Sequence, residues 1–205
     1  MFFRILEVGW VYDLLGKIIG AKAVRQYFVK HYVCPKPGLR ILDIGCGPGS
    51  MVTYLSDGEY LGIDANPKYI KRAQRRFPGK GKFLCCSILN AIELGRCSFD
   101  VAIGFGILHH LDDKEAFRLF QLAFNSLKPG GRFVTLDGCF RDKQHFIAYW
   151  MNRLDRGKYV RTLEEYATLA RQVFPNVRSF DYCGRLNLPF DYSVLICEKA
   201  TISHK

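Results

Sequence analysis

Residues 41–49 read Ile-Leu-Asp-Ile-Gly-Cys-Gly-Pro-Gly, an apolar strand that ends in an acid and glycines at every second position. Glycines lack side chains, so the turn after the strand can pass close beneath a ligand, and a helix that begins near Ser50 would offer free backbone amides. The spacing is tighter than in a dinucleotide-binding loop. Asp43 would repel a pyrophosphate but suits a ligand that carries positive charge.

A second acidic strand end follows the first at a regular separation. Residues 60–63 form an apolar run, and Asp64 comes twenty-one residues after Asp43. A carboxylate in this place can accept hydrogen bonds from both hydroxyls of a ribose. S-adenosylmethionine combines a ribose with an ammonium and a sulfonium, so both acids together predict a site for this cofactor.

Short apolar runs alternate with helical patterns along most of the chain. Strands are expected at 39–44, 60–63, 82–86, 99–105 and 132–136, and helices at 50–56, 68–77 and 114–127. A helix at 162–174 then precedes strands at 177–183 and 192–198, which a short loop joins. The pattern predicts an α/β fold, a doubly wound, Rossmann-like, seven-stranded and mostly parallel sheet with a final antiparallel hairpin and helices on both faces.

No repeat or flexible linker divides the chain, so we expect one domain over residues 1–205. Residues 1–36 are rich in aromatic and aliphatic side chains and are expected to form an N-terminal helical lid, with attachment to a membrane surface as the alternative. Residues 138–162 are expected to form an insertion that covers the acceptor side.

Two further stretches carry a resemblance to a known family. One runs from Phe99 to Leu111 and ends in His109-His110-Leu111, and the other, Leu127 to Arg132, holds a Pro-Gly-Gly turn. With the glycine loop and Asp64, the chain resembles class I S-adenosylmethionine-dependent methyltransferases of the small-molecule type, similar to methyltransferase domains 11 and 25. The resemblance implies transfer of a methyl group to a small-molecule acceptor, with S-adenosylhomocysteine as the product.

The resemblance also implies which residues contact the cofactor. They are Asp43, Gly45, Cys46, Gly47, Gly49, Asp64, Ala65, Ser87, Ile88, Phe105 and Tyr12. Asp64 would hold the ribose, Phe105 would lie near the methyl donor, and Tyr12 would close the lid. The family usually has an aspartate for the adenine amino group where this chain has Ser87, whose neutral hydrogen bond is roughly half as strong as a charged one.

Candidate residues for the acceptor come from the segments after the fourth and fifth strands. Methyl transfer needs a base only when the acceptor arrives protonated, and His109 or His110 can then take the proton. The alternative is that one histidine orients the loop and the other faces solvent. Arg156 and Arg161 can bind an anionic acceptor, or pair with acids on the surface, and Tyr149 can form part of the pocket wall.

The net charge of +11 leaves other functions open. Seven of the basic residues lie within 68–82, where apolar residues at helical spacing favour a solvated basic face over a patch for nucleic acid or membrane. The alternatives to a small-molecule methyltransferase are an RNA methyltransferase, a non-catalytic protein that keeps the cofactor fold, and an NAD-dependent oxidoreductase.

The start of the chain and its cysteines bear on localisation. Arg4 and Glu7 interrupt the apolar start where a signal peptide would continue, and no apolar stretch is long enough to span a bilayer. The eight cysteines lack the spacing of a zinc site, so we expect reduced thiols, a cytoplasmic protein and no metal. Cys85 and Cys86 are expected to fill space on a buried strand.

Overall fold

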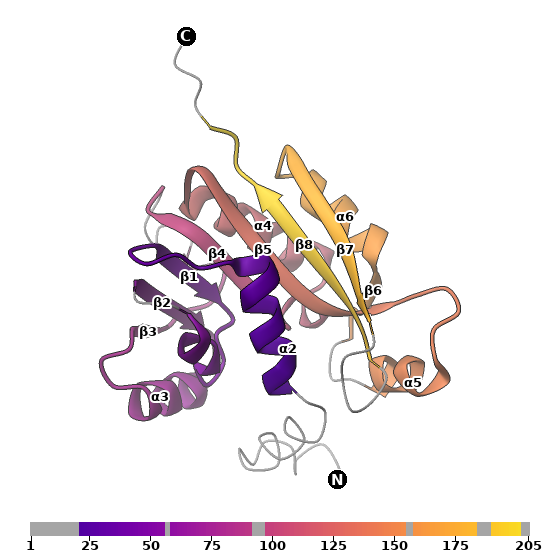
Figure 1. The fold of residues 1–205 in the computed structure, drawn as a ribbon, viewed down its shortest axis with the longest axis horizontal. Helices are drawn as coiled ribbons and strands as arrows, with labels where there is room; N and C mark the ends of the chain where they lie inside the picture. The colour runs from indigo at the N-terminus through magenta and orange to yellow at the C-terminus, as the bar shows by residue number, and fades with distance from the viewer. Residues whose placement is uncertain (1–20, 56–57, 92–96, 155–157, 184–189, 202–205) are drawn as a thin grey trace.

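The computed structural model describes residues 21–55, 58–91, 97–154, 158–183 and 190–201, which form one eight-stranded sheet in the order β3-β2-β1-β4-β5-β8-β7, with β6 beside β5 (Figure 1). Its strands are β1 (Arg40–Ile44), β2 (Glu59–Asp64), β3 (Lys82–Cys85), β4 (Phe99–Phe105), β5 (Leu127–Phe140), β6 (Arg161–Thr162), β7 (Asn176–Cys183) and β8 (Asp191–Glu198). Within the described residues, no helix is long and apolar enough to cross a bilayer.

The direction of the strands confirms the predicted fold class. β3, β2, β1, β4 and β5 pair in parallel, whereas β8 runs antiparallel to both β5 and β7. The sheet has one strand more than the seven predicted, because the two-residue strand β6 pairs with the end of β5. Sequence patterns do not detect so short a strand, because two residues show no periodicity.

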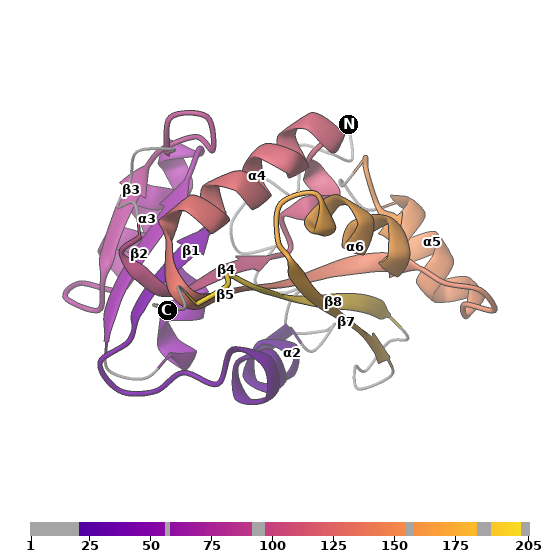
Figure 2. The same cartoon turned by 90° about the horizontal axis from the view of Figure 1, so that it is seen from above.

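Helices cover both faces of the sheet, with α4 and α6 on one face and α2 on the other (Figure 2). The helical elements are α2 (Ala21–Phe28), the π-helix η2 (Val29–Val33), the 3₁₀ helix η3 (Ser50–Tyr54), α3 (Pro67–Arg76), the 3₁₀ helix η5 (Leu108–His110), α4 (Asp113–Ser126), α5 (Phe146–Leu154) and α6 (Leu163–Arg171). Successive residues of β1 point to opposite faces, so Leu42 packs in the core beneath α4 and α6 and Ile41 in the core beneath α2 and α3.

Two local expectations were wrong. The helix expected at 50–56 is the 3₁₀ helix Ser50–Tyr54, because β-branched Val52 and Thr53 disfavour an α-helix and β2 begins soon after. Cys85 is exposed and Cys86 only partly buried, so they do not fill space in the core. β3 is an edge strand in which Phe83 alone is buried.

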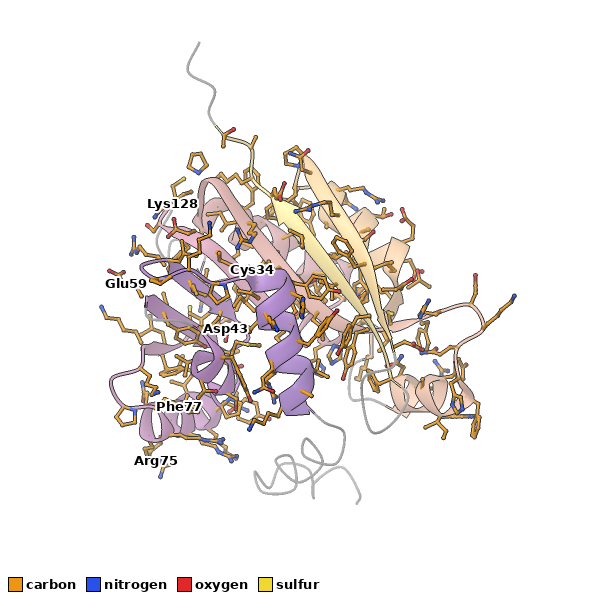
Figure 3. The ribbon with its side chains drawn as sticks, viewed as in Figure 1. Cys34, Asp43, Glu59, Arg75, Phe77 and Lys128 are labelled. Atoms are coloured by element: carbon orange, nitrogen blue, oxygen red, sulfur yellow. The ribbon has the colours of Figure 1, made fainter. Side chains whose placement is uncertain are left out.

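Helix α3 confirms the amphipathic pattern of the basic segment. The Asn66 side chain accepts a hydrogen bond from the Lys68 amide and caps the helix, and Pro67 occupies its first turn. Ile70 and Ala73 are buried against the sheet. Arg75 lies on the exposed side of the helix (Figure 3).

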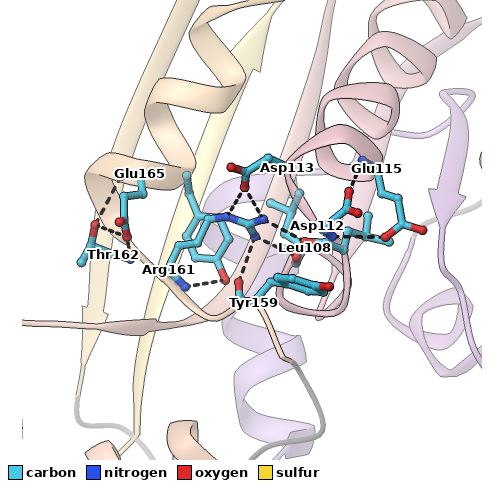
Figure 4. Close-up of polar contacts among 10 residues, drawn as sticks. Leu108, Asp112, Asp113, Glu115, Tyr159, Arg161, Thr162 and Glu165 are labelled. Atoms are coloured by element: carbon cyan, nitrogen blue, oxygen red, sulfur yellow. Dashed lines mark hydrogen bonds and ion pairs between the residues drawn. The ribbon is translucent and has the colours of Figure 1, made fainter.

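The short helix η5, which carries both histidines, is held in place by Arg161. The Arg161 guanidinium donates to Asp113 Oδ1 at 2.7 Å and to the Leu108 and Leu111 carbonyls at 3.2 and 2.8 Å (Figure 4). Further bonds to Tyr159 and Asp113 use its remaining N–H groups. This corrects the expectation that Arg161 binds an acceptor, because its donors are all taken within the chain.

We predict that Arg161→Met destabilises the fold by about 2–4 kcal/mol, because the buried Leu108 carbonyl and the partly buried Leu111 carbonyl lose their donor. The matched control is Arg178→Met, which removes an ion pair to Glu198 whose side chains are 61% and 42% exposed. The control should cost less than about 1 kcal/mol. Urea unfolding measures both values, and equal losses would show that Arg161 has no special structural role.

Candidate active site

The candidate site lies where the direction of the chain across the sheet reverses. From β1 the chain proceeds outward to β2 and β3, and then returns to β4 on the other side of β1. In open α/β sheets the loops at the carboxyl ends of the strands diverge at this point, so that a ligand can bind between them. The glycine loop after β1 and the η5 loop after β4 both start here.

The glycines of the loop serve two different purposes. A Cβ at Gly45 would collide with the side chain of Ile107, and one at Gly49 would lie 2.7 Å from Phe83. These glycines are required by the packing of the protein itself. Gly47 has a φ of +53°, and none of the described residues outside its own turn has an atom within 4 Å of its Cβ position, so among them Gly47 faces open space. The close approach of a ligand predicted from the sequence can therefore occur at Gly47.

Asp64 is joined to the glycine loop by a backbone hydrogen bond. The Gly47 N–H donates to Asp64 Oδ2 at 2.9 Å, and the Asn66 N–H donates to Oδ1 at 2.8 Å. The carboxylate is partly exposed, and each of its oxygens has a further lone pair. In this geometry the Asp64 carboxylate can accept a hydrogen bond from each of the two ribose hydroxyls. Ala65, the next residue, is exposed.

Asp43 is buried on β1, facing the side of the sheet that α2 covers (Figure 3). The Tyr60 hydroxyl donates to Asp43 Oδ2 at 2.6 Å. Burial raises the pKa of the Asp43 carboxyl to about 7, and the hydrogen bond from Tyr60 and the charge of Arg25 oppose this rise. Tyr60 could not be identified from the sequence as the partner of Asp43, because the alternation of apolar and polar residues marks it only as a core residue.

Helix α2 contributes two side chains above Phe105, the residue expected near the methyl donor. The guanidinium carbon of Arg25 lies 5.4 Å from the centre of the Phe105 ring, and the Phe28 ring lies 5.4 Å away on centroids. Helix α2, part of the expected lid, therefore packs over the end of β4. Tyr12 lies outside the described residues.

The remaining expected cofactor contacts differ in exposure. The Ser87 hydroxyl accepts a weak hydrogen bond from the Asn90 amide at 3.3 Å. Ile88 is partly buried against the core. Burial raises the pKa of the Cys46 thiol, so Cys46 remains protonated, and its sulfur occupies the space that a side chain at position 62 would need. Cys46 therefore acts in packing.

The two histidines differ in burial and in their contacts. His109 is buried, and its Nδ1 lies 2.8 Å from Asp137 Oδ1. His110 is exposed, with its ring 4.1 Å from the His109 ring on centroids. A Cβ at Gly106 would lie 3.7 Å from Cε1 of His109, which places His109 beside the residue that follows Phe105.

Asp137 is the functional candidate that the sequence analysis missed. Its side chain is fully buried, and no described group bonds to its Oδ2. Burial raises the pKa of Asp137, whereas the hydrogen bond and charge of His109 and the amides of His109 and Leu108 lower it. The sequence does hold a signal for Asp137, because this acid lies near the carboxyl end of the fifth strand, as Asp43 and Asp64 lie near the ends of theirs.

Of the expected acceptor residues, the structure describes Tyr149 and Arg161. Tyr149 is 45% exposed on α5, and its ring contacts Phe140 and Trp150. Arg156 lies outside the described residues. The Arg161 guanidinium binds the carbonyls of Leu108 and Leu111 instead of facing the site. The Tyr159 amide donates a hydrogen bond to the His109 carbonyl at 3.0 Å. The segment after α5 therefore contacts the histidine loop through its backbone.

Comparisons with known proteins agree with this geometry. Residues 41–131 match the family model of a methyltransferase domain. The chain is 31% identical over 147 residues to phosphoethanolamine N-methyltransferase 1 of Arabidopsis thaliana, covering 66% of this chain and 28% of that protein. It is 30% identical over 149 residues to the phosphoethanolamine N-methyltransferase of Plasmodium falciparum, covering 69% of this chain and 56% of that protein. The chain thus spans about a quarter to about half of these relatives.

A solved structure shows the same fold. Phosphoethanolamine N-methyltransferase 2 of Haemonchus contortus, in complex with phosphomonomethylethanolamine and S-adenosylhomocysteine, matches with a TM-score of 0.68. The match is 17% identical in sequence and covers 87% of this chain and 53% of that one. Residues 41–131 thus match a methyltransferase domain, and the fold of the chain is that of methyltransferases.

Proposed function

We propose that the chain is a cytosolic S-adenosylmethionine-dependent methyltransferase that acts on a small-molecule acceptor. The observation that carries the proposal is the open space at Gly47, whose amide is bonded to Asp64 at the point where the sheet reverses direction. A glycine in this conformation, with no described side chain over its Cβ position, suits a ligand that approaches the backbone closely.

The residues around Gly47 fit the chemistry of this cofactor. Asp64 can accept hydrogen bonds from the ribose, and Asp43 supplies negative potential that favours an ammonium or a sulfonium. The Ser87 hydroxyl is proposed to accept a hydrogen bond from the adenine. When bound, S-adenosylmethionine supplies a methyl group that is already activated for displacement. The protein then has to hold donor and acceptor in line, which can account for up to about 7–11 kcal/mol of the barrier.

His109 is the proposed base for an acceptor that arrives protonated. In the tautomer in which Nδ1 donates to Asp137, the lone pair that accepts a proton is on Nε2. Asp137 fixes this tautomer and stabilises the imidazolium that forms, as a buried carboxylate does in other histidine dyads. His110 is exposed and is proposed to have no part in the proton transfer.

The relatives point to a first acceptor to test. Both named relatives are phosphoethanolamine N-methyltransferases, so phosphoethanolamine and other small amines are the first acceptors to screen. An ammonium must lose a proton before its nitrogen can attack, which is the case in which a base is needed. We propose that residues 138–162, including Tyr149, cover this acceptor.

We predict that Asp64→Ala weakens binding of S-adenosylmethionine by more than about tenfold, because hydrogen bonds to a charged acceptor are worth about 1.5–3 kcal/mol each. Glu59→Ala is the matched control, since Glu59 is an exposed carboxylate at the other end of β2. Calorimetric titration with S-adenosylmethionine, S-adenosylhomocysteine and NAD measures the effect. Binding of NAD alone, or of none of the three, would contradict the proposed function.

We predict that affinity for S-adenosylmethionine falls as the pH drops below about 7. A cation near Asp43 favours the ionised carboxylate, and below its raised pKa the free protein holds this group protonated. Affinity should be about tenfold lower at pH 6 than at pH 8. Asp43→Asn cannot ionise and should show a flatter pH profile. Identical profiles for the two proteins would exclude an electrostatic role for Asp43.

We predict that His109→Ala lowers kcat for a protonated acceptor by about 10²–10⁴-fold while affinity for S-adenosylhomocysteine stays the same. Asp137→Asn should also lower kcat, because the Asn amide cannot fix the same tautomer. His110→Ala is the control on the adjacent exposed residue and should retain activity. If all three variants keep full kcat with phosphoethanolamine or another accepted amine, proximity alone drives the reaction.

A further inference from the structure

Helix α5 exposes its aromatic residues and buries its small ones. Phe146, Tyr149 and Trp150 are 68%, 45% and 55% exposed. They are three and four residues apart, so they share one face of the helix, and Arg153 continues that face. The opposite face holds Ala148 and Asn152, which are buried. A surface helix normally has the reverse pattern, with its apolar face against the core.

These aromatic side chains form one patch. The Phe146 ring stacks on His145 at 5.0 Å between centroids, and the Tyr149 ring packs against Phe140 at 5.6 Å and Trp150 at 5.8 Å. A contiguous apolar patch on the surface of a protein marks an interaction site more often than isolated exposed residues do. We therefore define the aromatic face of α5 as Phe146, Tyr149 and Trp150.

The charges near this face favour an anionic partner. Exposed Lys143, Arg153 and Lys158 flank it in the sequence, and residues 141–158 as a whole hold more basic residues than acids, the acids being Asp142 and Asp155. The whole chain carries a net charge of +11. A short helix with Trp, Tyr and Phe on one face and Lys and Arg nearby is typical of segments that lie in the headgroup region of an anionic bilayer. Its nine residues are too few to span one.

The position of α5 connects this face to the candidate site. The helix follows the carboxyl end of β5, the edge of the sheet at which the glycine loop and η5 also lie. Figures 1 and 2 both show α5 at one extremity of the molecule, and Figure 1 shows it beyond β6. A flat surface can contact α5 there and lie next to the edge that carries the site.

We propose that α5 docks the protein on anionic lipid bilayers by inserting Phe146 and Trp150, the two most exposed rings of its aromatic face, among the headgroups. The docking is peripheral, with Lys143, Arg153 and Lys158 facing the lipid phosphates. It turns the acceptor side of the sheet toward the membrane. The occupant of the aromatic face is the lipid surface, and the proposal holds whether or not the chain transfers methyl groups.

Flotation of the full chain with vesicles tests this proposal. The chain should float with vesicles of phosphatidylglycerol and phosphatidylcholine and much less with phosphatidylcholine alone. Phe146→Ser/Trp150→Ser should reduce the bound fraction by more than about tenfold, because large aromatic side chains lose their burial in lipid. The matched control is Lys71→Gln/Arg75→Gln on α3, which removes exposed charge from the other basic surface and should retain most of the binding.

Fluorescence gives a second measurement that reports on α5 itself. In a Trp10→Phe background, Trp150 is the sole tryptophan, and its emission should shift to shorter wavelength when anionic vesicles are added. Thermal unfolding and S-adenosylhomocysteine affinity should be the same for Phe146→Ser/Trp150→Ser and the parent, which shows that the variant folds.

Three outcomes would overturn the proposal. Unchanged flotation of Phe146→Ser/Trp150→Ser is one, and loss of flotation in the α3 variant alone is another, since both would assign lipid binding to general charge. The third is an oligomer, seen by sedimentation without lipid, that dissociates in Phe146→Ser/Trp150→Ser. That result would make the occupant of the aromatic face a second copy of the chain.

Discussion

The close packing of Gly45 against Ile107 is the constraint on which the arrangement of the site depends. A side chain at position 45 would collide with Ile107, and Ile107 immediately precedes the helix η5 that carries His109. The loop that would hold a cofactor is therefore packed directly against the loop that would hold a base. Arg161 fixes the other side of η5 through the Leu108 and Leu111 carbonyls. Packing on both sides of η5 thus sets the distance between His109 and the loop that would hold the methyl donor.

The same edge of the sheet concentrates three acids, and each is accommodated differently. Asp64 remains partly exposed and accepts two backbone amides. Asp43 is buried with Tyr60, and Asp137 is buried with His109. Burial raises the pKa of both buried carboxyls, because their loss of water outweighs the opposing effects of Tyr60 and Arg25 at Asp43 and of His109 at Asp137. A bound cation would relieve this electrostatic cost at Asp43, which favours a positively charged ligand over a phosphate.

The sequence allowed the sheet, the glycine loop and Asp64 to be predicted, because each depends on a local pattern. The pairs Tyr60–Asp43, His109–Asp137 and Arg161–Asp113 could not be predicted in the same way. Their members are 17, 28 and 48 residues apart, and tertiary packing alone brings them together. Arg161 in particular has the chemistry of an anion-binding residue. Only the positions of the Leu108, Leu111 and Tyr159 carbonyls show that its donors are already used.

Helix α5 could not be predicted from its sequence pattern either, because its aromatic residues face solvent and Ala148 and Asn152 face the core. The Asn152 side chain donates to the Cys139 carbonyl at 2.7 Å, and its Oδ1 lies 2.8 Å from where a Cβ at Gly138 would be. Small residues at 138 and 148 therefore allow the helix to approach β5 closely, and no space remains on that side for Phe146 or Trp150. The aromatic residues face outward because the inner face is already filled. Because α5 packs closely against β5, the strand that carries Asp137, its aromatic face points outward. The same packing places this face next to the carboxyl end of β5, on the acceptor side of the sheet.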